Sequence, residues 1–359
     1  MPDTKPDLWF NEAGICAACL AYESRASVDW VDRLAQLRGI VDRHKTPHYD
    51  CIVPSSGGKD SHFQVLTMLS LGYRPLVVTA TTDHLTDLGR RNIENLKRQG
   101  VDTIEVTPDP VLRRRINRLG LETIGDISYP EHVAIFTIPV RFAVRYHIPL
   151  IVWGENSQHE YGGPATSQES STLTRRWLEE FGGLNGMRAS ELPTFLNVPE
   201  RDCWLYTYPS DEELKLSGVT GIFLGYFVPW DGQHNAQIAQ ASGFETYPTF
   251  VEGSACNYEN LDNAQTGVHD YFKYLKFGFG RATDICCSLI RRGRLTRDEG
   301  WRIVQQHDGR YPASYLGVSL YELLDEIGMT RERFDEVCEE FTNWNLFDGV
   351  RDDGSPRLR

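Results

Sequence analysis

The sequence predicts an α/β fold built on a parallel sheet and followed by a helical region. Between residues 51 and 154, short apolar runs alternate with helical patterns, which is the order typical of parallel strands joined by helices. The runs 51–54 and 149–153 consist mostly of apolar residues, as buried strands do. After residue 266 the pattern is helical, and two helix-start signatures support it, Thr296-x-x-Glu299 and Ser319-x-x-Glu322.

We expect three regions along the chain. Residues 1–28 form a small segment that contains Cys16-Ala-Ala-Cys19. Residues 29–265 form the α/β domain, with an insertion near 164–220, where the pattern is least regular. Residues 266–359 form the helical C-terminal region.

The overall composition of the chain excludes some classes of function. The chain has 359 residues, of which 40% are hydrophobic, so it can bury a substantial core. Its net charge of −13 argues against broad nucleic-acid binding, which relies on clustered Lys and Arg. No apolar run has the length of a membrane span, and the first residues lack the apolar core of a secretion signal. We therefore expect a cytoplasmic protein with reduced cysteines that acts on a small molecule, without membrane or nucleic-acid partners.

The individual elements follow from periodicity and from helix and strand breakers. Apolar residues from Trp30 to Val41 recur at helical spacing and predict a helix before the first strand. Gly100 ends a later helix, and Pro108 closes a later strand. The predicted strands are 51–54, 74–81, 101–107 and 149–154, with a further strand and turn over 221–232, and the predicted helices are 59–71, 86–99, 111–119 and 131–147.

The stretch Tyr49–Ser61 runs from a strand through a glycine turn into a helix, which is the arrangement of an anion site. Glycines let the backbone approach an anion, and the free N–H groups and dipole of a helix start attract it. Lys59 adds a full charge, and Ser56 and Ser61 add hydroxyl donors. Asp60 either caps the helix or holds a divalent cation. The sequence therefore predicts a phosphate site, although its spacing differs from the Walker loop.

Two further places meet the same edge of the predicted sheet, because ligands of parallel sheets bind where strands end. One is Thr81–His84, which contains Asp83. The other is Gly154–Gly163, a polar stretch after a wholly apolar strand. Its side chains either hold Mg²⁺ or orient a substrate, or they form a solvated loop; the candidates are Glu155, Asn156, His159 and Glu160.

Two other patterns leave alternatives open. His269, Lys273 and Lys276 fall near one helical face before a glycine-rich turn with Arg281, which suits an anionic ligand or a solvated cationic face. The pair Cys16 and Cys19 is half of a zinc ribbon, and the chain has no second C-x-x-C. It is either two ordinary thiols or a zinc site completed by distant Cys or His residues.

The loop Ser56-Gly-Gly-Lys-Asp-Ser61 resembles the S-G-G-x-D-S loop of the PP-loop ATP pyrophosphatases, whose fold is Rossmann-like. Those enzymes split ATP between its α- and β-phosphates and adenylate an oxygen of the substrate. Several separate stretches also resemble the bacterial N-acetyl sugar amidotransferases of surface-polysaccharide and O-antigen biosynthesis. They are 49–61, 89–95, 125–128, 130–132, 153–156, 160–163 and 267–284.

This resemblance implies conversion of a sugar acetamido group to an acetamidino group with ATP and Mg²⁺. Ammonia is expected from separate subunits that resemble the glutaminase and cyclase of imidazole glycerol phosphate synthase. The implied catalytic residues are Lys59, Asp60, Glu155 and Asn156. The implied ATP contacts are Ser56, Gly57, Gly58, Lys59, Asp60, Ser61 and Asp83, with Asp60 also a magnesium ligand. The implied contacts to a free or nucleotide-linked N-acetyl sugar are His132, Glu160, Tyr161, His269, Lys273 and Arg281.

Two rival functions stay open at this point. A tRNA-thiolating or lysine-ligating PP-loop enzyme fits the loop and the C-x-x-C pair, but the acidic balance opposes it. A nucleotide-binding assembly subunit would bind ATP without turnover. The zinc site at Cys16 and Cys19, and self-association as a homo-oligomer, are further expectations that the sequence does not decide.

Overall fold

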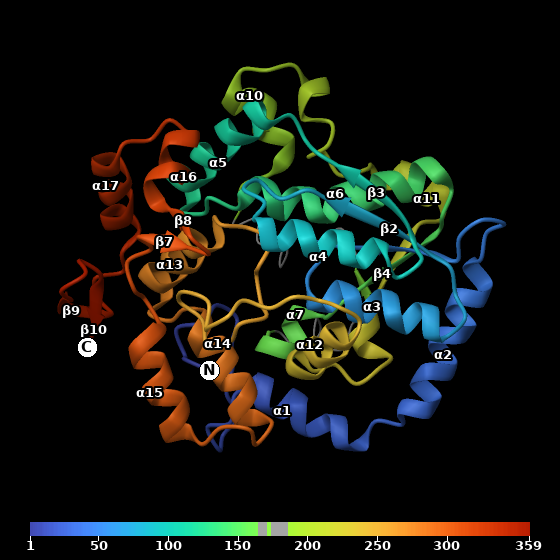
Figure 1. Cartoon of the computed structure of the whole chain (residues 1–359), viewed down its shortest axis with the longest axis horizontal. Coiled ribbons are helices and arrows are strands. Elements are labelled where there is room, and N and C mark those ends of the chain that lie inside the picture. Colours follow the sequence, from blue (N-terminus) through green and yellow to red (C-terminus); the bar gives the residue numbers. More distant parts are fainter. Residues whose placement is uncertain (164–170, 174–185) are drawn as a thin grey trace.

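The computed structural model describes residues 1–163, 171–173 and 186–359 (Figure 1). The first part of the predicted insertion, 164–170 and 174–185, therefore lies outside the described residues. Its remainder forms short elements: the 3-10 helices η2 (Ala189–Glu191) and η3 (Glu200–Cys203), and the helices α10 (Leu192–Leu196) and α11 (Asp211–Ser217).

The centre of the molecule is a six-stranded sheet in the order β3-β2-β1-β4-β6-β5. All its pairs are parallel except that of β5 with β6, so the predicted α/β class with a parallel sheet is confirmed. The strand order reverses between β1 and β4, and ligands of such sheets bind in the crevice at that reversal. The strands are β1 (Cys51–Pro54), β2 (Pro75–Ala80), β3 (Asp102–Val106), β4 (Leu150–Trp153), β5 (Thr172–Leu173) and β6 (Thr220–Phe223).

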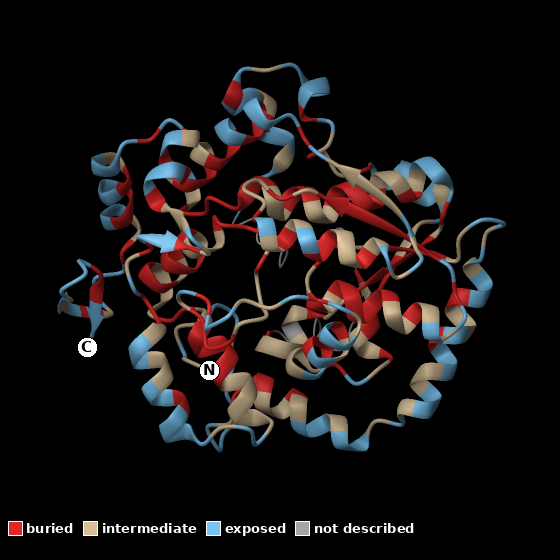
Figure 2. Cartoon of the chain, in the orientation of Figure 1, coloured by how far each residue is buried: buried red, intermediate tan, exposed pale blue. Residues whose placement is uncertain are grey.

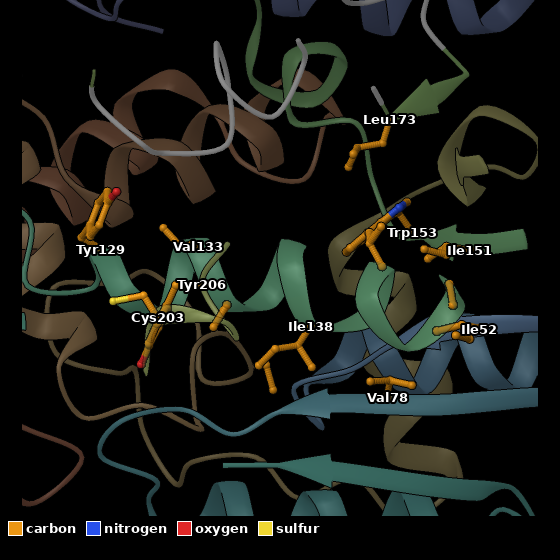
Figure 3. Packing of buried hydrophobic residues seen from close by; sticks show 14 of the residues in the cluster. Ile52, Val78, Tyr129, Val133, Ile138, Ile151, Trp153, Leu173, Cys203 and Tyr206 are labelled. Atoms are coloured by element: carbon orange, nitrogen blue, oxygen red, sulfur yellow. The ribbon is translucent and has the colours of Figure 1, made fainter. Parts of the chain in front are cut away.

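Side chains of each buried strand alternate between two cores, one on each face of the sheet. Ile52 packs against α6, whereas its neighbours Cys51 and Val53 pack on the opposite face. Figure 3 shows the first core, where Ile138 of α6 points toward β2 and Val133 lies near Tyr129. Helices α2 (Trp30–His44), α3 (Lys59–Ser70), α4 (Asp87–Lys97) and α12 (Gly232–Ala241) cover one face, and α5 (Pro110–Ile124), α6 (Tyr129–Tyr146), α10 and α11 cover the other.

The C-terminal region is helical, as predicted, but it also contains two short antiparallel pairs that the sequence patterns did not indicate. Its core is formed by α13, α16 and α17, and Leu121 of α5 joins it to the α/β domain. The predicted helix starts at Thr296 and Ser319 are both present as capping boxes. The elements are α13 (Thr266–Phe277), α14 (Arg281–Arg291), α15 (Arg297–His307), α16 (Leu320–Glu326), α17 (Arg331–Phe341), β7 (Ser314–Tyr315), β8 (Val318–Ser319), β9 (Phe347–Val350) and β10 (Pro356–Leu358).

The N-terminal segment packs along the periphery, where Figure 2 shows mostly exposed and intermediate residues. It contains α1 (Ala17–Ser24) and the 3-10 helix η1 (Arg25–Ser27), and α1 packs on α7 (Ser157–Tyr161), which follows β4. The predicted strand over 221–232 is shorter than expected, because a 3-10 turn, η4 (Leu224–Tyr226), ends it. Among the described residues, no helix is both long enough and apolar enough to cross a bilayer.

Candidate functional site

The 55–61 loop connects β1 to α3 at the point where the strand order reverses. Gly57 has a φ of +82°, and its N–H is held by the Ser55 hydroxyl at 3.0 Å. The Ser61 hydroxyl accepts from the N–H of Ser56 at 3.2 Å. The N-cap residue of α3 is Gly58, which has no side chain to cap the helix, so the first N–H groups of α3 can face an anion.

Lys59 lies at the start of α3 and is buried, with 6% of its surface exposed. Its Nζ is 2.5 Å from Asp60 Oδ2 and 3.2 Å from Glu259 Oε1. Burial alone would lower the pKa of Lys59, but the charges of Asp60 and Glu259 raise it well above its usual value. The lysine is therefore a fixed positive charge beside the loop.

Glu155 and Tyr161 approach the same place from the segment after β4. The indole N–H of Trp230 donates to Glu155 Oε2 at 2.8 Å. Burial, together with the nearby charge of Asp60, raises the pKa of the Glu155 carboxyl to about 7. The pKa of Tyr161 is raised well above its usual value by the Glu155 charge and by burial.

Arg281 reaches the site from the start of α14. Its guanidinium makes two hydrogen bonds to Asp270, at 3.0 and 3.1 Å, which fix its orientation. Burial would lower the pKa of Arg281, but the Asp270 charge raises it, so the group stays charged. It contributes a second fixed cation to the site, beside Lys59.

These residues line one polar cavity of about 170 Å³. The structure thus brings the predicted loop together with Glu155, Tyr161 and Arg281, which lie far apart in the sequence. A second, apolar cavity of about 290 Å³ adjoins it and shares Ser56 and Glu155 with it. The apolar cavity is lined mainly by Pro54, Ala80, Ile135, Phe136, Pro139 and Trp153, from β1, β2, β4 and α6.

Residues 244–262 supply part of the polar cavity, and sequence reasoning missed them. This irregular segment crosses in front of the loop and contributes Glu259 and Asp262. Burial raises the pKa of the Asp262 carboxyl to about 6. The signal available in the sequence was a polar stretch without periodicity just before a helix, but such stretches are usually solvated loops. The other lining residues that were not predicted are Gly89, Asn92, Phe244, Tyr258, Asn260 and Leu261.

Asp83 lies outside the lining of the polar cavity. Its side chain is 2.5 Å from Nε of Arg113, and Asn117 donates to it. Arg113 also donates to the main-chain oxygens of Thr81 and Asp83, so this group holds the chain after β2 in place. Burial raises the pKa of the Asp83 carboxyl. Asp83 therefore forms a buried ion pair with Arg113.

Asn156 and Glu160 line a neighbouring cavity beside the N-terminal segment and are absent from the lining of the polar cavity. Glu160 contacts Arg25, and its Oε2 is 3.0 Å from Arg292 Nη2. It thereby links η1, α7 and α14. Lys273 pairs with Asp284 and lies over the ring of Phe279.

The three residues that were predicted to form a cationic face on α13 each contact a different partner. His269 contacts Asp126 at 2.8 Å, Lys273 pairs with Asp284, and Lys276 donates to the carbonyl oxygens of residues 124 and 125. His132 joins His269 beside Asp126, with ring centroids 5.1 Å apart. These two predicted substrate residues therefore lie together, in a cluster outside the polar cavity.

Cys16 and Cys19 face each other, with their sulfur atoms 3.5 Å apart. Burial opposes ionisation of Cys16, but hydrogen bonding from Cys19 and nearby positive charge lower its pKa. Within residues 1–163, 171–173 and 186–359, no third His, Cys or carboxylate completes a compact ligand set with this pair. The predicted zinc site stays a prediction.

Comparison with known protein families finds a match for the C-terminal part of the chain. Residues 242–351 match the family model described as LPS biosynthesis protein WbpG-like, C-terminal domain. No curated protein matches the chain. The matched residues include Glu259, Asp262 and Arg281, which line the polar cavity together with the loop. This part of the chain is therefore similar to a domain of LPS biosynthesis proteins.

Proposed function

We propose that the chain is an ATP-dependent amidotransferase that converts an N-acetyl group of a sugar to an acetamidino group. One observation carries this proposal: the Ser56–Ser61 loop and the family-matched residues line one polar cavity at the reversal of the strand order. The loop suits a nucleotide phosphate, and the matched region is similar to a domain of LPS biosynthesis proteins. An enzyme that joins ATP to a sugar accounts for both.

The two adjoining cavities suit the two ends of ATP. The polar cavity offers the start of α3, the Ser61 hydroxyl and Lys59 to a pyrophosphate. The apolar cavity offers Phe136 and Trp153 to an adenine ring. Because Ser56 and Glu155 line both cavities, one ligand with a polar and an apolar end can occupy both.

The acidic side chains of the polar cavity fit Mg²⁺, which prefers carboxylate oxygens. The raised pKa of Glu155 reflects burial near other negative charges, and a divalent cation would relieve this repulsion. When bound, Mg²⁺ would neutralise charge on the β- and γ-phosphates. The residues that would hold it are Asp60, Glu155, Glu259 and Asp262.

The acceptor sugar fits a third cavity, of about 240 Å³, which shares Arg281 with the polar one. Tyrosine rings line it, and sugars pack well on such rings. The buried Tyr271 lines this cavity from α13, a helix of the family-matched region. Arg281 stands at the junction, where it can orient a sugar carboxylate or phosphate toward the nucleotide. The main lining side chains are Asp270, Tyr271, Arg281, His307, Tyr311 and Tyr315.

The chemistry requires activation because an amide carbonyl is a poor electrophile. The amide oxygen would attack the α-phosphorus of ATP, and the bond to the β-phosphate oxygen would break to release pyrophosphate. Lys59 and the helix start would stabilise the charge that develops on that leaving group. Ammonia would then add to the amide carbon, the C–O bond to AMP would break, and a proton would be lost. A separate glutaminase subunit is the proposed source of ammonia.

The test supplies ATP, Mg²⁺, an ammonium salt and a panel of N-acetyl sugars, free and linked to UDP. The expected result is formation of AMP and pyrophosphate, together with a sugar product whose mass reflects replacement of oxygen by an NH group. Lys59→Met should reduce the rate at least about 100-fold, the size of effect expected when a stabilising charge is lost. Lys215→Met, on the outer helix α11, is the matched control and should leave the rate unchanged.

Two outcomes would count against the proposal. If ATP binds but no sugar supports AMP formation, the chain is a nucleotide-binding subunit. If AMP forms only in the presence of tRNA, the enzyme modifies RNA, as the loop alone allows.

A further inference from the structure

Three potential metal ligands converge at the boundary between the α/β domain and the family-matched region. Asp126 lies in the turn between α5 and α6, His132 lies in the first turns of α6, and His269 lies on α13. One ligand atom from each lies within 4.8 Å of the others. In the described part of the chain this is the only such set of three His, Cys or acidic residues.

The contacts within this cluster are only partly explained by hydrogen bonding. His269 Nδ1 is 2.8 Å from Asp126 Oδ1, and this contact is a hydrogen bond. His132 Nδ1 is 3.1 Å from Asp126 Oδ2, but both atoms are buried, and neither makes a hydrogen bond to any residue that the structure describes. The contact between His132 and Asp126 is therefore short, but its angle is not that of a hydrogen bond from the ring nitrogen to the oxygen.

The neighbouring cations do not satisfy the free carboxylate oxygen either. Lys276 donates to the carbonyl oxygens of residues 124 and 125, both at 3.1 Å. Arg281 is bound to Asp270. The Asp126 side chain is 2% exposed, so its carboxylate is shielded from bulk solvent. A buried carboxylate oxygen and a buried imidazole nitrogen without partners call for a ligand between them.

We propose that Asp126, His132 and His269 bind a divalent transition-metal ion, with Zn²⁺ as the best match. Imidazole nitrogen suits Zn²⁺ and its neighbours in the first row, and a carboxylate completes the three-ligand set found in open zinc sites. A fourth position is then left for water. The two imidazole side chains are 23% and 26% exposed, which gives the ion a route into the cluster.

This ion would fasten the family-matched region to the α/β domain. Asp126 and His132 belong to the α5–α6 connection, whereas His269 lies within residues 242–351. Asn263 in the matched region also donates to Glu131, beside His132. The neighbouring Asp262 lines the polar cavity, so the ion would hold that wall in place. The metal site does not depend on the reaction proposed above.

The experiment must separate this site from the two facing cysteines. We would use the full chain with Cys16→Ser and Cys19→Ser, remove metal with a chelator, and dialyse the protein against Zn²⁺. Elemental analysis should find one ion per chain. With Co²⁺ as the probe, visible d–d bands should appear without the near-ultraviolet charge transfer that a thiolate ligand produces.

Variants of the cluster locate the ion. His132→Asn and His269→Asn, each in the cysteine-free background, should weaken Zn²⁺ binding at least about 10-fold and remove the Co²⁺ bands. His84→Asn is the matched control, because His84 Nδ1 lies 3.2 Å from Glu326 in a pair that lacks a third ligand. It should bind as the parent does. Unaltered Zn²⁺ binding in folded His132→Asn and His269→Asn would overturn the proposal, as would a parent that binds no Zn²⁺.

Discussion

Gly57 is the residue on which the geometry of the 55–61 loop depends most directly. Its φ of +82° is costly for any residue with a Cβ, and a Cβ there would lie 2.6 Å from Ile93 Cγ1 and 3.0 Å from the Ile93 nitrogen. We expect Gly57→Ala to be less stable by roughly 2–4 kcal/mol, measured by urea unfolding. Gly72→Ala is the control, because Gly72 has a φ of +84° with no atom within 4 Å of its Cβ position. Its cost should be about 1 kcal/mol, from backbone strain alone. Equal costs for the two variants would show that Ile93 does not constrain the loop.

Glu155 makes the stability of the ligand-free chain depend on pH. Its folded-state pKa of about 7 exceeds the usual 4.5, so the native state binds a proton that the unfolded state has already lost between those values. The wild type should therefore lose stability as pH rises through this interval, whereas Glu155→Gln has no carboxyl to ionise. The unfolding midpoint of Glu155→Gln minus that of the wild type should increase from about pH 5 to about pH 8.

The matched control for that series is Glu200→Gln, because Glu200 is an exposed residue of η3. Its midpoint should follow the wild type at every pH. A difference for Glu155→Gln that stays constant with pH would mean that the carboxyl is ionised throughout the range.

At the scale of elements, the start of α14 is capped by a residue from another helix. Asp308, at the end of α15, accepts from the Gly280 N–H at 2.9 Å and from the Thr283 N–H at 3.3 Å. This contact sets where α14 begins, and hence where Arg281 enters the polar cavity. Asp308 is 3% exposed, so it accepts these two hydrogen bonds away from bulk solvent.

We expect Asp308→Ala to lose about 2–4 kcal/mol of stability, because it removes two main-chain bonds at a buried helix start. Ser319→Ala, which removes the local cap of α16, should cost only about 1 kcal/mol. Chemical unfolding of both variants checks this order. If Asp308→Ala is no worse than Ser319→Ala, the cap from α15 does not hold α14.

At the scale of the whole molecule, Arg292 connects the three regions of the chain. It lies on the C-terminal side of α14, its Nη2 is 3.0 Å from Glu160 Oε2, and its Nε is 3.1 Å from Asp231 Oδ2. Its guanidinium also lies over the ring of Tyr22 in α1. The arginine side chain is 4% exposed, so these charges are shielded from water.

Arg292→Met should destabilise the fold by about 2–3 kcal/mol, because it removes a buried cation from Glu160 and Asp231 and leaves these carboxylates with Arg25 and Arg294. Arg294→Met is the control: it also removes a bond to Asp231, but the Arg294 side chain is 37% exposed and its loss should cost less than about 1 kcal/mol. Thermal unfolding measures both. Similar losses would mean that burial of the Arg292 network adds little to stability.

The sequence by itself determined what local chemistry controls. The apolar runs of β1 and β4 form buried strands because their side chains can face two cores, and the Ser55–Gly58 turn leads into α3 because glycine permits the required φ. Each of the capping boxes of α15 and α16 can be recognised from four consecutive residues of the sequence. For the same reason the strand, turn and helix of the 55–61 loop could be predicted from the sequence.

Only the tertiary structure decided which side chains share a site. Glu259 and Asp262 face the loop because residues 244–262 cross in front of it, and no periodicity in that segment indicates this path. Lys273 and His269 lie on one helix, yet they contact different partners, Asp284 and Asp126. The physical reason is that contacts between residues distant in the chain depend on how whole elements pack, whereas turns, caps and strands depend on near neighbours.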